Sequence, residues 1–559
     1  MITTGSFIET AKFPVKLVNK ASAREKQGGG RPPHWEMVFW WARRPLAGAR
    51  AVVAGSLLPE DTSEHSFIRW LRLDAKETPH RLNPEIPSSV REKIRQVRLL
   101  DPFAGFGSIP LEAIRLGVGE VVAVELLPTA YIFLKAVLEY PKEYSGLRAK
   151  VPGREIKELG LEDTTRKVAN VKKIEESRYY EMPSLIYDVA RWGRWIIQKL
   201  GEDPDLRELY EEGVAVYIGG WEVRCPVCGK YTVLDKNWWL AKNPKEKLYV
   251  YAKPVVRNGE VSFEVVEGKP SENPLGNLNV KREYARCLIC GSSISQIDPK
   301  SGSVYAKKGD APENIRKSLV FYPKHALRDW NKKLEEYLEG RIGIEELRKA
   351  LARPIIRFRV KINNGKTVFE PASKEDNEKL WKALEKLRQM WGDPDIPTEP
   401  MTPYGGPTLG DPPLIFRNFY KLFNPRQLLT LVKLVKLVRE AGRRVEEEKL
   451  REGWDREKAH KYAEAVTTYL AIALVNHMRH NSIVTSIEPT QKFIAHALAF
   501  RGIAMTWNWV DEYPIANVIG SLTRTIKSCI DGLSYLVSAV SGSPSRVRVL
   551  LDDATVLSK

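Results

Sequence analysis

The stretch Leu99–Ser108, which reads LLDPFAGFGS, decides the fold that we expect for this chain. It joins a mostly apolar run, Val97–Leu100, to an apolar pattern with helical spacing at Ile109–Leu116, and two glycines lie in the turn between them. Short apolar runs bounded by turn residues are typical of buried strands, and Gly117 is a suitable residue to end a helix. The stretch therefore predicts a strand, a tight turn and a helix.

The residues that follow repeat this pattern. Val121–Val124 is a second apolar run, it ends at Glu125, and Ala130–Glu139 again has helical spacing. The order strand, turn, helix, strand, helix is the opening of a doubly wound parallel sheet. We therefore expect an α/β fold built on a Rossmann-like sheet.

Acidic residues at the two strand ends, together with the glycines, predict a site for a nucleotide-like ligand. Gly105 and Gly107 permit a tight turn and the close approach of a ligand to the main chain. Asp101 can accept from a cationic amine, and Glu125 from two ribose hydroxyls. The third glycine of the nicotinamide-dinucleotide pattern is absent, which argues against an NAD-dependent dehydrogenase. The alternative is a turn whose glycines serve packing alone.

Four of the five cysteines form two C-x-x-C-G pairs, Cys225 with Cys228 and Cys287 with Cys290. Four thiolates make a closed tetrahedral shell, which is typical of structural zinc. The strand-like stretches between the pairs suit a zinc ribbon. Two separate redox pairs, or cysteines that are simply buried, remain the alternatives.

The composition points to a polyanionic partner inside the cell. Lys and Arg number 88 against 70 Asp and Glu, which gives a formal charge of +18. Such an excess favours nucleic acid, most simply DNA, although a basic surface can also serve solubility alone. We find no apolar run of membrane-spanning length and no signal peptide at Met1–Phe7. We therefore expect a cytoplasmic protein without a membrane partner.

Changes of texture along the chain divide it into three segments. Residues 1–140 hold the N-terminal segment and the first half of the sheet, with the glycine turn within 97–125. Residues 141–400 read as an insertion that carries the zinc ribbon at about 215–300. Residues 401–559 read as helices that return to the sheet in a last apolar strand. The expected helices are Pro425–Ala441, Glu447–Val475 and Ile515–Val540, and the expected last strand is Val547–Leu551.

Several stretches resemble a known family. The string D-P-F-x-G-x-G-S at Asp101–Ser108 resembles motif I of the methyltransferases that modify exocyclic amines in DNA. FPVKLVNKASAREKQGGGRPPHW, WWARRPLAGARAVVAGSLL, CPVCGKYTVLDKNWWL, LFNPRQLL and MTWNWVDEYPIANVIGS are similar to segments of the predicted adenine-specific DNA methylases that contain a zinc ribbon and carry the DUF1156 domain. The resemblance implies an S-adenosylmethionine-dependent enzyme that methylates the exocyclic amine of adenine in DNA.

The resemblance also implies roles for single residues. Asp101, Phe103, Gly105 and Gly107 would hold the methionine end of the cofactor, and Glu125 would hold its ribose. Asp553, in the last strand RVLLDDA, would meet the adenine of the cofactor.

Three arginines are candidates for phosphate contacts, because a guanidinium suits bidentate binding of phosphate. They are Arg43, Arg44 and Arg426. The alternative is a solvated basic face.

The catalytic motif of the family is not found. In the family, the strand after RVLLDDA ends in D-P-P-Y, whose acid and backbone carbonyl polarise the target amine and whose ring stacks on the flipped base. Here the sequence stops at Lys559, before such a strand. The one D-P-P, Asp411–Pro413, lies in a Pro/Gly-rich loop and is followed by Leu414, so Asp411 is only a weak catalytic candidate.

From this departure we expect an incomplete sheet and the cofactor-binding half of a split enzyme, whose second polypeptide carries D-P-P-Y. Two other functions stay open. One is a non-catalytic DNA-binding or scaffold protein descended from a methylase. The other is an RNA methyltransferase, because zinc ribbons and basic charge serve RNA equally well.

Overall fold

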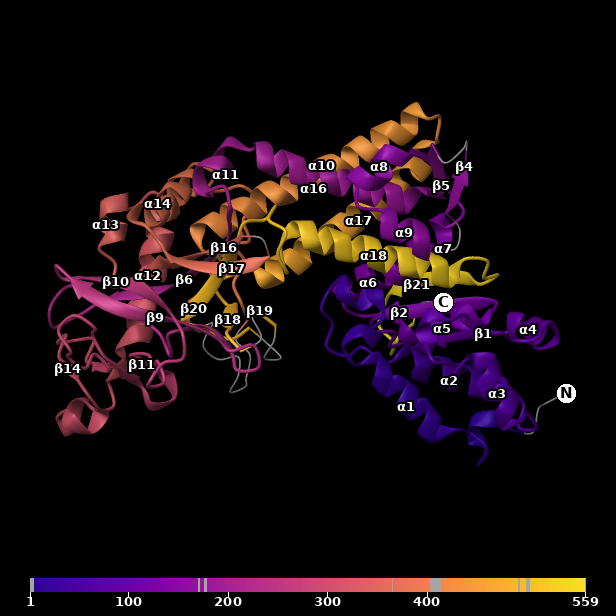
Figure 1. Cartoon of the computed structure of the whole chain (residues 1–559), viewed down its shortest axis with the longest axis horizontal. Coiled ribbons are helices and arrows are strands. Elements are labelled where there is room, and N and C mark those ends of the chain that lie inside the picture. The colour runs from indigo at the N-terminus through magenta and orange to yellow at the C-terminus, as the bar shows by residue number, and fades with distance from the viewer. Residues whose placement is uncertain are drawn as a thin grey trace. The chain divides into compact units, whose positions relative to one another are not determined.

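The protein is described by a computed structural model that covers residues 5–168, 171–174, 178–363, 365–402, 414–490, 493–498 and 503–557. Contacts divide the chain into two compact units. Unit 1 is Met1–Ile196, Val438–Asn476 and Thr525–Lys559, and unit 2 is Ile197–Leu437 and His477–Arg524. Both units combine helices with strands, so the expected mixed α/β character is confirmed (Figure 1). The segment boundaries expected at residues 140 and 400 stay predictions.

Unit 1 contains two small sheets and the helices around them. Its helices are α1 (Val15–Glu25), α2 (Leu46–Leu57), α3 (Glu64–Leu71), α4 (Ser88–Arg95), α5 (Ser108–Leu116), α6 (Pro128–Leu134), a π-helical turn (Lys135–Glu139), α7 (Tyr140–Tyr144), α8 (Gly153–Glu158) and α9 (Glu162–Lys167). Its strands are β1 (Arg98–Asp101), β2 (Glu120–Glu125), β3 (Arg148–Pro152), β4 (Lys172–Ile174), β5 (Tyr179–Pro183) and β21 (Arg546–Leu551). Four further helices contribute residues to both units: α10 (Ser184–Glu202), α16 (Pro425–Arg451), α17 (Arg456–His480) and α18 (Leu522–Val540).

Three parallel strands form a sheet in the order β1-β2-β21. The residues expected to bind the cofactor lie at or near the ends of these strands. Figure 1 shows β21, from the C-terminal part of the chain, beside β2. Helix α5 packs on β1 and β2, and α6 packs on β2 and β21. The three strands expected from the apolar runs are thus confirmed. The described residues do not form a full doubly wound sheet, so the finer fold class stays a proposal.

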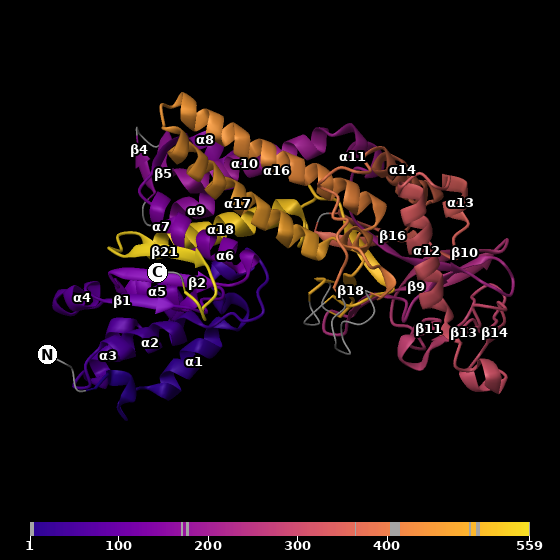
Figure 2. The same cartoon turned by 180° about the vertical axis from the view of Figure 1, so that it is seen from behind.

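A fully buried ion cluster joins α5 to the N-terminal helices, which Figure 2 shows gathered beside it. Arg50 of α2 donates its Nε to Glu112 of α5 at 2.6 Å, and Arg115 donates to the same carboxylate at 2.6 Å. The arginines also donate to the carbonyls of Leu71 and Leu82. Burial alone would raise the pKa of Glu112, but the charges of Arg115 and Arg50 outweigh burial and hold it below its ordinary value.

Unit 2 is built around a five-stranded antiparallel sheet in the order β17-β16-β6-β20, in which β7 also pairs with β6. A second antiparallel sheet has the order β10-β9-β8, and the two share one apolar core. The strands are β6 (Val214–Arg224), β7 (Tyr231–Leu234), β8 (Trp239–Asn243), β9 (Leu248–Arg257), β10 (Glu260–Glu267), β11 (Leu278–Asn279), β12 (Tyr284–Ala285), β13 (Gln296–Ile297), β14 (Val304–Tyr305), β15 (Val320–Phe321), β16 (Ala352–Asn363), β17 (Lys366–Pro371), β18 (Ser486–Glu488), β19 (Phe493–Ala495) and β20 (Asn508–Glu512). The helices are α11 (Pro204–Leu209), α12 (Tyr322–Leu338), α13 (Ile344–Arg348) and α14 (Lys374–Gln389).

The expected single helix Glu447–Val475 is wrong, because the helix is interrupted between Arg451, where α16 ends, and Arg456, where α17 begins. Gly453 adopts a left-handed φ of 87°, which a continuous right-handed helix does not allow. Asp455 then accepts from the backbone N–H of Lys458 and so caps the start of α17. Separately, no helix in the described part of the chain is both long and apolar enough to span a bilayer.

Replacing Glu112 should destabilise unit 1 strongly. Glu112→Ala leaves two buried guanidinium groups without their anion, and we expect the free energy of unfolding to fall by about 3–5 kcal/mol. Glu92→Ala is the matched control, since it removes an ion pair with Arg95 whose side chains are 69% and 56% exposed, and should cost less than about 1 kcal/mol. Urea denaturation followed by circular dichroism measures both.

The same comparison has a pH dependence with a defined sign. The folded protein holds the pKa of Glu112 below its ordinary value of 4.5. The ionised Glu112 carboxylate therefore stabilises the fold above pH 4.5, and this stabilisation is lost as the pH falls through the lowered pKa. The difference between wild type and Glu112→Ala should therefore shrink in acid. Equal stability of the two proteins at neutral pH would contradict the assigned role.

Candidate cofactor and metal sites

The glycine turn after β1 holds two glycines with different tasks. Gly105 and Gly107 have φ values of 56° and 79°, in the left-handed region that favours glycine. A Cβ on Gly107 would lie 3.1 Å from the Leu134 side chain, so this glycine serves packing. A Cβ on Gly105 would have the Trp40 Nε1 as its nearest described neighbour, at 4.0 Å. Main chain that is accessible to a ligand is therefore found at Gly105.

The three acidic residues expected to bind the cofactor lie at or just past the carboxyl ends of three adjacent parallel strands. Asp101 ends β1, Glu125 ends β2, and Asp553 follows β21. The Oε1 of Glu125 accepts from the Gly105 N–H at 2.8 Å, so the second acid fixes the turn that follows the first strand. The Asp552 N–H donates to the Glu125 carbonyl at 3.1 Å, which continues the pairing of β2 with β21 past the strand end.

Acidic side chains and one exposed aromatic side chain lie at the carboxyl ends of these strands. The Phe103 N–H donates to Asp101 Oδ1 at 3.1 Å. Burial raises the pKa of Asp101 against this hydrogen bond, and the charge of Glu125 adds to the rise. Phe103 is 78% exposed. Asp553 accepts from the backbone and hydroxyl of Thr555. A cofactor role for these residues stays a prediction.

Sequence reasoning missed the aromatic residues that support the turn. The buried ring of His34 stacks between Phe106 and Tyr535 at centroid distances of 5.8 and 5.4 Å. Burial lowers the pKa of His34 well below its ordinary value, so the ring is neutral. Ser108, at the start of α5, donates its hydroxyl to the Arg44 carbonyl at 2.8 Å. The signal was available, because His34 and Arg44 lie in the N-terminal stretches that carry the resemblance.

Two of the three candidate arginines are engaged inside the protein. Arg43 lies over the Trp35 and Phe39 rings and donates to the carbonyls of Trp35 and Trp40, so its guanidinium organises this loop. Arg44 is exposed. It is the N-terminal candidate that keeps an accessible position for a phosphate.

The expected phosphate contact of Arg426 is wrong for this structure. The side chain is 0% exposed and forms an ion pair with Asp511 at 2.8 Å. The Tyr210 and Tyr217 rings lie 4.5 and 4.0 Å from the guanidinium carbon. A charge buried in this way has no surface to offer a polyanion. Arg426 instead ties the LFNPRQLL stretch to β20, which carries Asp511.

The four paired cysteines meet in one cluster. The Sγ atoms of Cys225, Cys228, Cys287 and Cys290 all lie within 4.8 Å of one another. Cys225 and Cys290 are 3.8 Å apart, and Cys228 and Cys287 are 4.0 Å apart. A tetrahedron with Zn–S bonds of about 2.3 Å has edges of about 3.8 Å. The cluster is therefore close enough to hold a metal ion, and its dimensions suit zinc.

The two cysteine pairs have the same turn geometry. The residue after each second cysteine is a left-handed glycine, with φ of 72° at Gly229 and 75° at Gly291. Each glycine N–H donates to the carbonyl of the first cysteine of its pair, at 2.8 and 3.1 Å. The first pair lies between β6 and β7, and the second follows β12. A bound ion would therefore join the small β12 segment to the five-stranded sheet.

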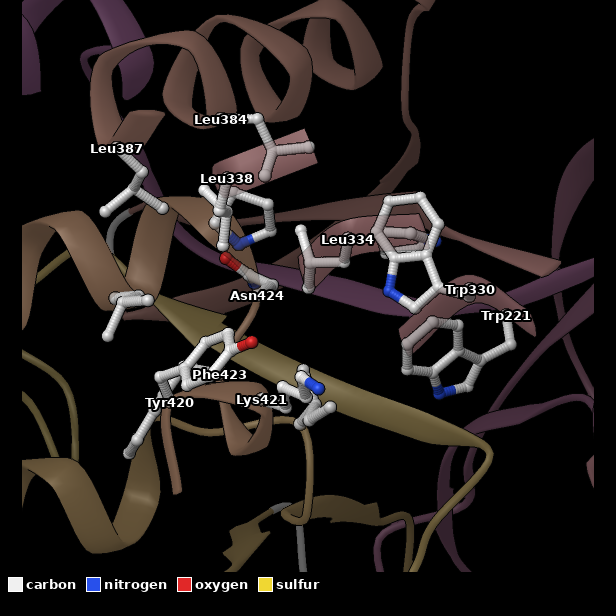
Figure 3. A pocket seen from close by; sticks show the side chains of 14 residues that line it. Trp221, Trp330, Leu334, Leu338, Leu384, Leu387, Tyr420, Lys421, Phe423 and Asn424 are labelled. Atoms are coloured by element: carbon white, nitrogen blue, oxygen red, sulfur yellow. The ribbon is translucent and has the colours of Figure 1, made fainter. Parts of the chain in front are cut away.

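Unit 2 also contains a mostly apolar cavity. Figure 3 shows the Tyr420 hydroxyl and the Lys421 amino group among carbon side chains. Lys421 pairs with Glu335 at 2.7 Å, and within the described residues the Tyr420 hydroxyl has no hydrogen-bond partner. Among the side chains that line the cavity, no pair suits acid–base or nucleophilic chemistry. The lining residues are Trp221, Trp330, Leu334, Leu338, Pro354, Leu384, Leu387, Tyr420, Lys421, Phe423, Asn424, Pro425, Leu428 and Ile483. The weak catalytic candidate Asp411 lies outside the described residues.

Metal analysis tests the cysteine cluster. We expect about one zinc per chain by elemental analysis, and its loss in Cys228→Ser with a lower melting temperature, because three thiolates no longer close the shell. Cys529→Ser is the matched control, since Cys529 is buried in α18 and lies outside the cluster. A folded wild-type protein that stays metal-free in the presence of zinc would refute the site.

Residues 12–78 match the family model described as protein of unknown function (DUF1156). No curated protein and no solved structure matches the chain. The matched residues include α1, α2 and α3, with Arg50 of the buried ion cluster, and the loop of Trp40 and Arg43 beside the glycine turn. The family model thus covers the N-terminal segment that packs against the candidate cofactor edge.

Proposed function

We propose that this chain is an S-adenosylmethionine-dependent DNA methyltransferase that acts on the exocyclic amine of adenine. The observation that carries the proposal is the edge of the parallel sheet. Three acids lie at or just past the carboxyl ends of adjacent strands, and Gly105, whose Cβ position has no described neighbour closer than 4.0 Å, lies in the turn after the first of these strands. Ligands of open α/β sheets bind outside the carboxyl ends of the strands.

Each residue at this edge has a task in the proposal. Asp101 accepts from the amino group of the methionine moiety, and Gly105 lets that moiety approach the main chain. Glu125 uses the carboxylate oxygen that does not hold the Gly105 N–H to accept from the ribose. Asp553 accepts from the adenine. The cofactor supplies the methyl group, and the protein supplies alignment with the target nitrogen.

The surface charge supports a nucleic acid substrate. The chain carries a net charge of +18, and Arg44 presents an exposed guanidinium in the loop that packs on the glycine turn. In the proposal Arg44 contacts a phosphate near the target base. The zinc cluster has a structural role, because four thiolates leave no open coordination position.

No described strand ends in the acceptor groups that the target amine needs. No D-P-P-aromatic stretch occurs in the sequence, and among the described residues β1 pairs with a strand on one side only. Leu100 of β1 is 53% exposed. Open strand edges with apolar residues recruit further strands. We propose that a strand ending in D-P-P-Y, which is not part of residues 1–559, pairs with β1 and so extends the doubly wound sheet.

Calorimetry with S-adenosylmethionine tests the cofactor site. Wild type should bind, Gly105→Val should lose binding because the new side chain fills the ligand's space, and Glu125→Ala should weaken it by about 1.5–3 kcal/mol. Gly117→Ala is the matched control, since Gly117 also has a left-handed φ, of 90°, at the other end of α5.

The outcomes separate the competing functions. Binding of NAD with no response to S-adenosylmethionine would overturn the proposal. Binding of DNA with no response to either cofactor would favour the non-catalytic DNA-binding or scaffold protein.

Transfer of a tritiated methyl group tests catalysis. Residues 1–559 alone should transfer very slowly, because the neutral exocyclic amine needs acceptors placed to stabilise its developing charge. A polypeptide bearing D-P-P-Y should restore transfer to adenine in DNA. Asp411→Ala is the control, and it should change nothing. Robust activity of the chain alone that disappears in Asp411→Ala would make that loop the catalytic site, and a preference for RNA would favour the alternative substrate.

A further inference from the structure

The sheet β10-β9-β8 of unit 2 presents three aromatic rings on one face. Trp239 of β8 is paired with Tyr251 of β9, and Lys242 is paired with Tyr249. Residues paired across two strands share a face, as do residues two apart along one strand. The Trp239 ring centroid lies 6.3 Å from that of Tyr249 and 6.0 Å from that of Tyr251. The three rings therefore form one cluster on one face.

This face is not the core face. The residues that alternate with the tyrosines, Val250 and Ala252, are buried in the apolar core of unit 2, together with Phe263 of β10. Trp239, Tyr249 and Tyr251 are each partly exposed. The outer face of an antiparallel sheet is usually polar. Three clustered aromatic rings on it are an observation that core packing does not explain.

Positive charge surrounds the rings. The Lys242 Nζ lies 4.9 Å from the Trp239 ring centroid. Lys253 follows Tyr251 by two residues on the same face and is exposed, and the turn between β8 and β9 adds exposed Lys245 and Lys247. Acidic residues are also present, and exposed Glu272 directly precedes Asn273, which accepts from the Trp239 ring. Glu264, paired with Lys253, is bound by Arg257 at 3.1 Å, and Glu246 lies in the turn.

The cluster is held in place before any partner arrives. The Trp239 Nε1 donates to Asn273 Oδ1 at 2.9 Å, which fixes the indole ring. The two tyrosines stand on a strand within a three-stranded sheet, so their spacing is set by the backbone at about 6.6–6.8 Å. A rigid set of rings loses little conformational entropy when it binds a planar partner.

We propose that this face is a binding surface for single-stranded nucleic acid. Bases of a single strand expose their ring faces, which a duplex hides, and stacking on an aromatic side chain contributes about 1–3 kcal/mol per base. In this assignment bases stack on Tyr249, Tyr251 and Trp239, while Lys242 and Lys253 contact phosphates. The surface does not depend on the cofactor site and would serve single-stranded DNA or RNA with little sequence preference.

Fluorescence anisotropy with a labelled oligothymidylate of about 16 nucleotides tests the surface. The double variant Tyr249→Ala, Tyr251→Ala should bind at least about 30-fold more weakly, since two stacking contacts are lost. Tyr284→Ala is the matched control, because Tyr284 is 42% exposed in unit 2 on a different sheet, and it should bind like wild type. Zinc content and melting temperature establish that each variant is folded.

A second variant separates stacking from charge. Lys242→Gln, Lys253→Gln should reduce the slope of log Kd against log salt by about 1.4, since each single-strand phosphate contact contributes about 0.7. A folded double-tyrosine variant that binds as tightly as Tyr284→Ala would overturn the inference. So would a wild-type preference for duplex DNA that the tyrosine changes leave intact.

The outcome is distinguishable from that of the cofactor proposal. Loss of oligonucleotide binding in the tyrosine variant, in a protein that does not bind S-adenosylmethionine, would leave this surface standing and remove only the proposed methyl transfer. If the protein binds S-adenosylmethionine but the tyrosine substitutions leave its affinity for the oligonucleotide unchanged, the cofactor proposal stands and this surface is ruled out.

Discussion

The carboxylate of Glu112 is the constraint on which unit 1 depends. It lies fully buried between Arg50 and Arg115, so three ionised groups share one dry site. Moving such charges out of water is costly, and the site is stable only with every member in place. Arg50 belongs to the N-terminal helices and Glu112 to the helix that follows the glycine turn. Their pairing therefore fixes the DUF1156-like segment against the candidate cofactor edge, where Arg43 and His34 then order the loop and the turn.

Unit 2 uses the same physical device at Asp511. Its carboxylate accepts from Arg426 and from Asn424, and the neighbouring Gln427 donates to the Val510 carbonyl. These bonds join two stretches that are far apart in the chain, LFNPRQLL and MTWNWVDEYPIANVIGS, both of which carry the family resemblance. An arginine that looks like a phosphate ligand in the sequence thus serves the interior. The partly exposed Tyr249 and Tyr251 of β9 show the opposite case, because ordinary strand residues place aromatic rings on the outer face of a sheet.

Local patterns predicted the local structure well. The apolar runs that end at Asp101 and Glu125 form β1 and β2, and Gly117 ends α5 as expected. The two C-x-x-C-G pairs meet in one cluster, as expected for a shared metal site. Local pattern failed where the deciding contact is distant or where a single residue interrupts a helix. Gly453 broke a long helical pattern, because periodicity alone does not reveal a backbone conformation that only glycine favours.

The sequence by itself determined the strand–turn–helix unit, the acids at its strand ends, and the chemistry of the four cysteines. These depend on neighbouring residues, whose dihedral preferences and hydrophobic spacing are readable in order. Only the tertiary structure decided that β21 lies beside β2, that Gly107 is closely packed while Gly105 is loosely packed, and that Arg426 is buried. Each of these depends on which distant segments exclude water together. The free energy of that burial belongs to pairs of surfaces, and no single stretch of sequence contains it.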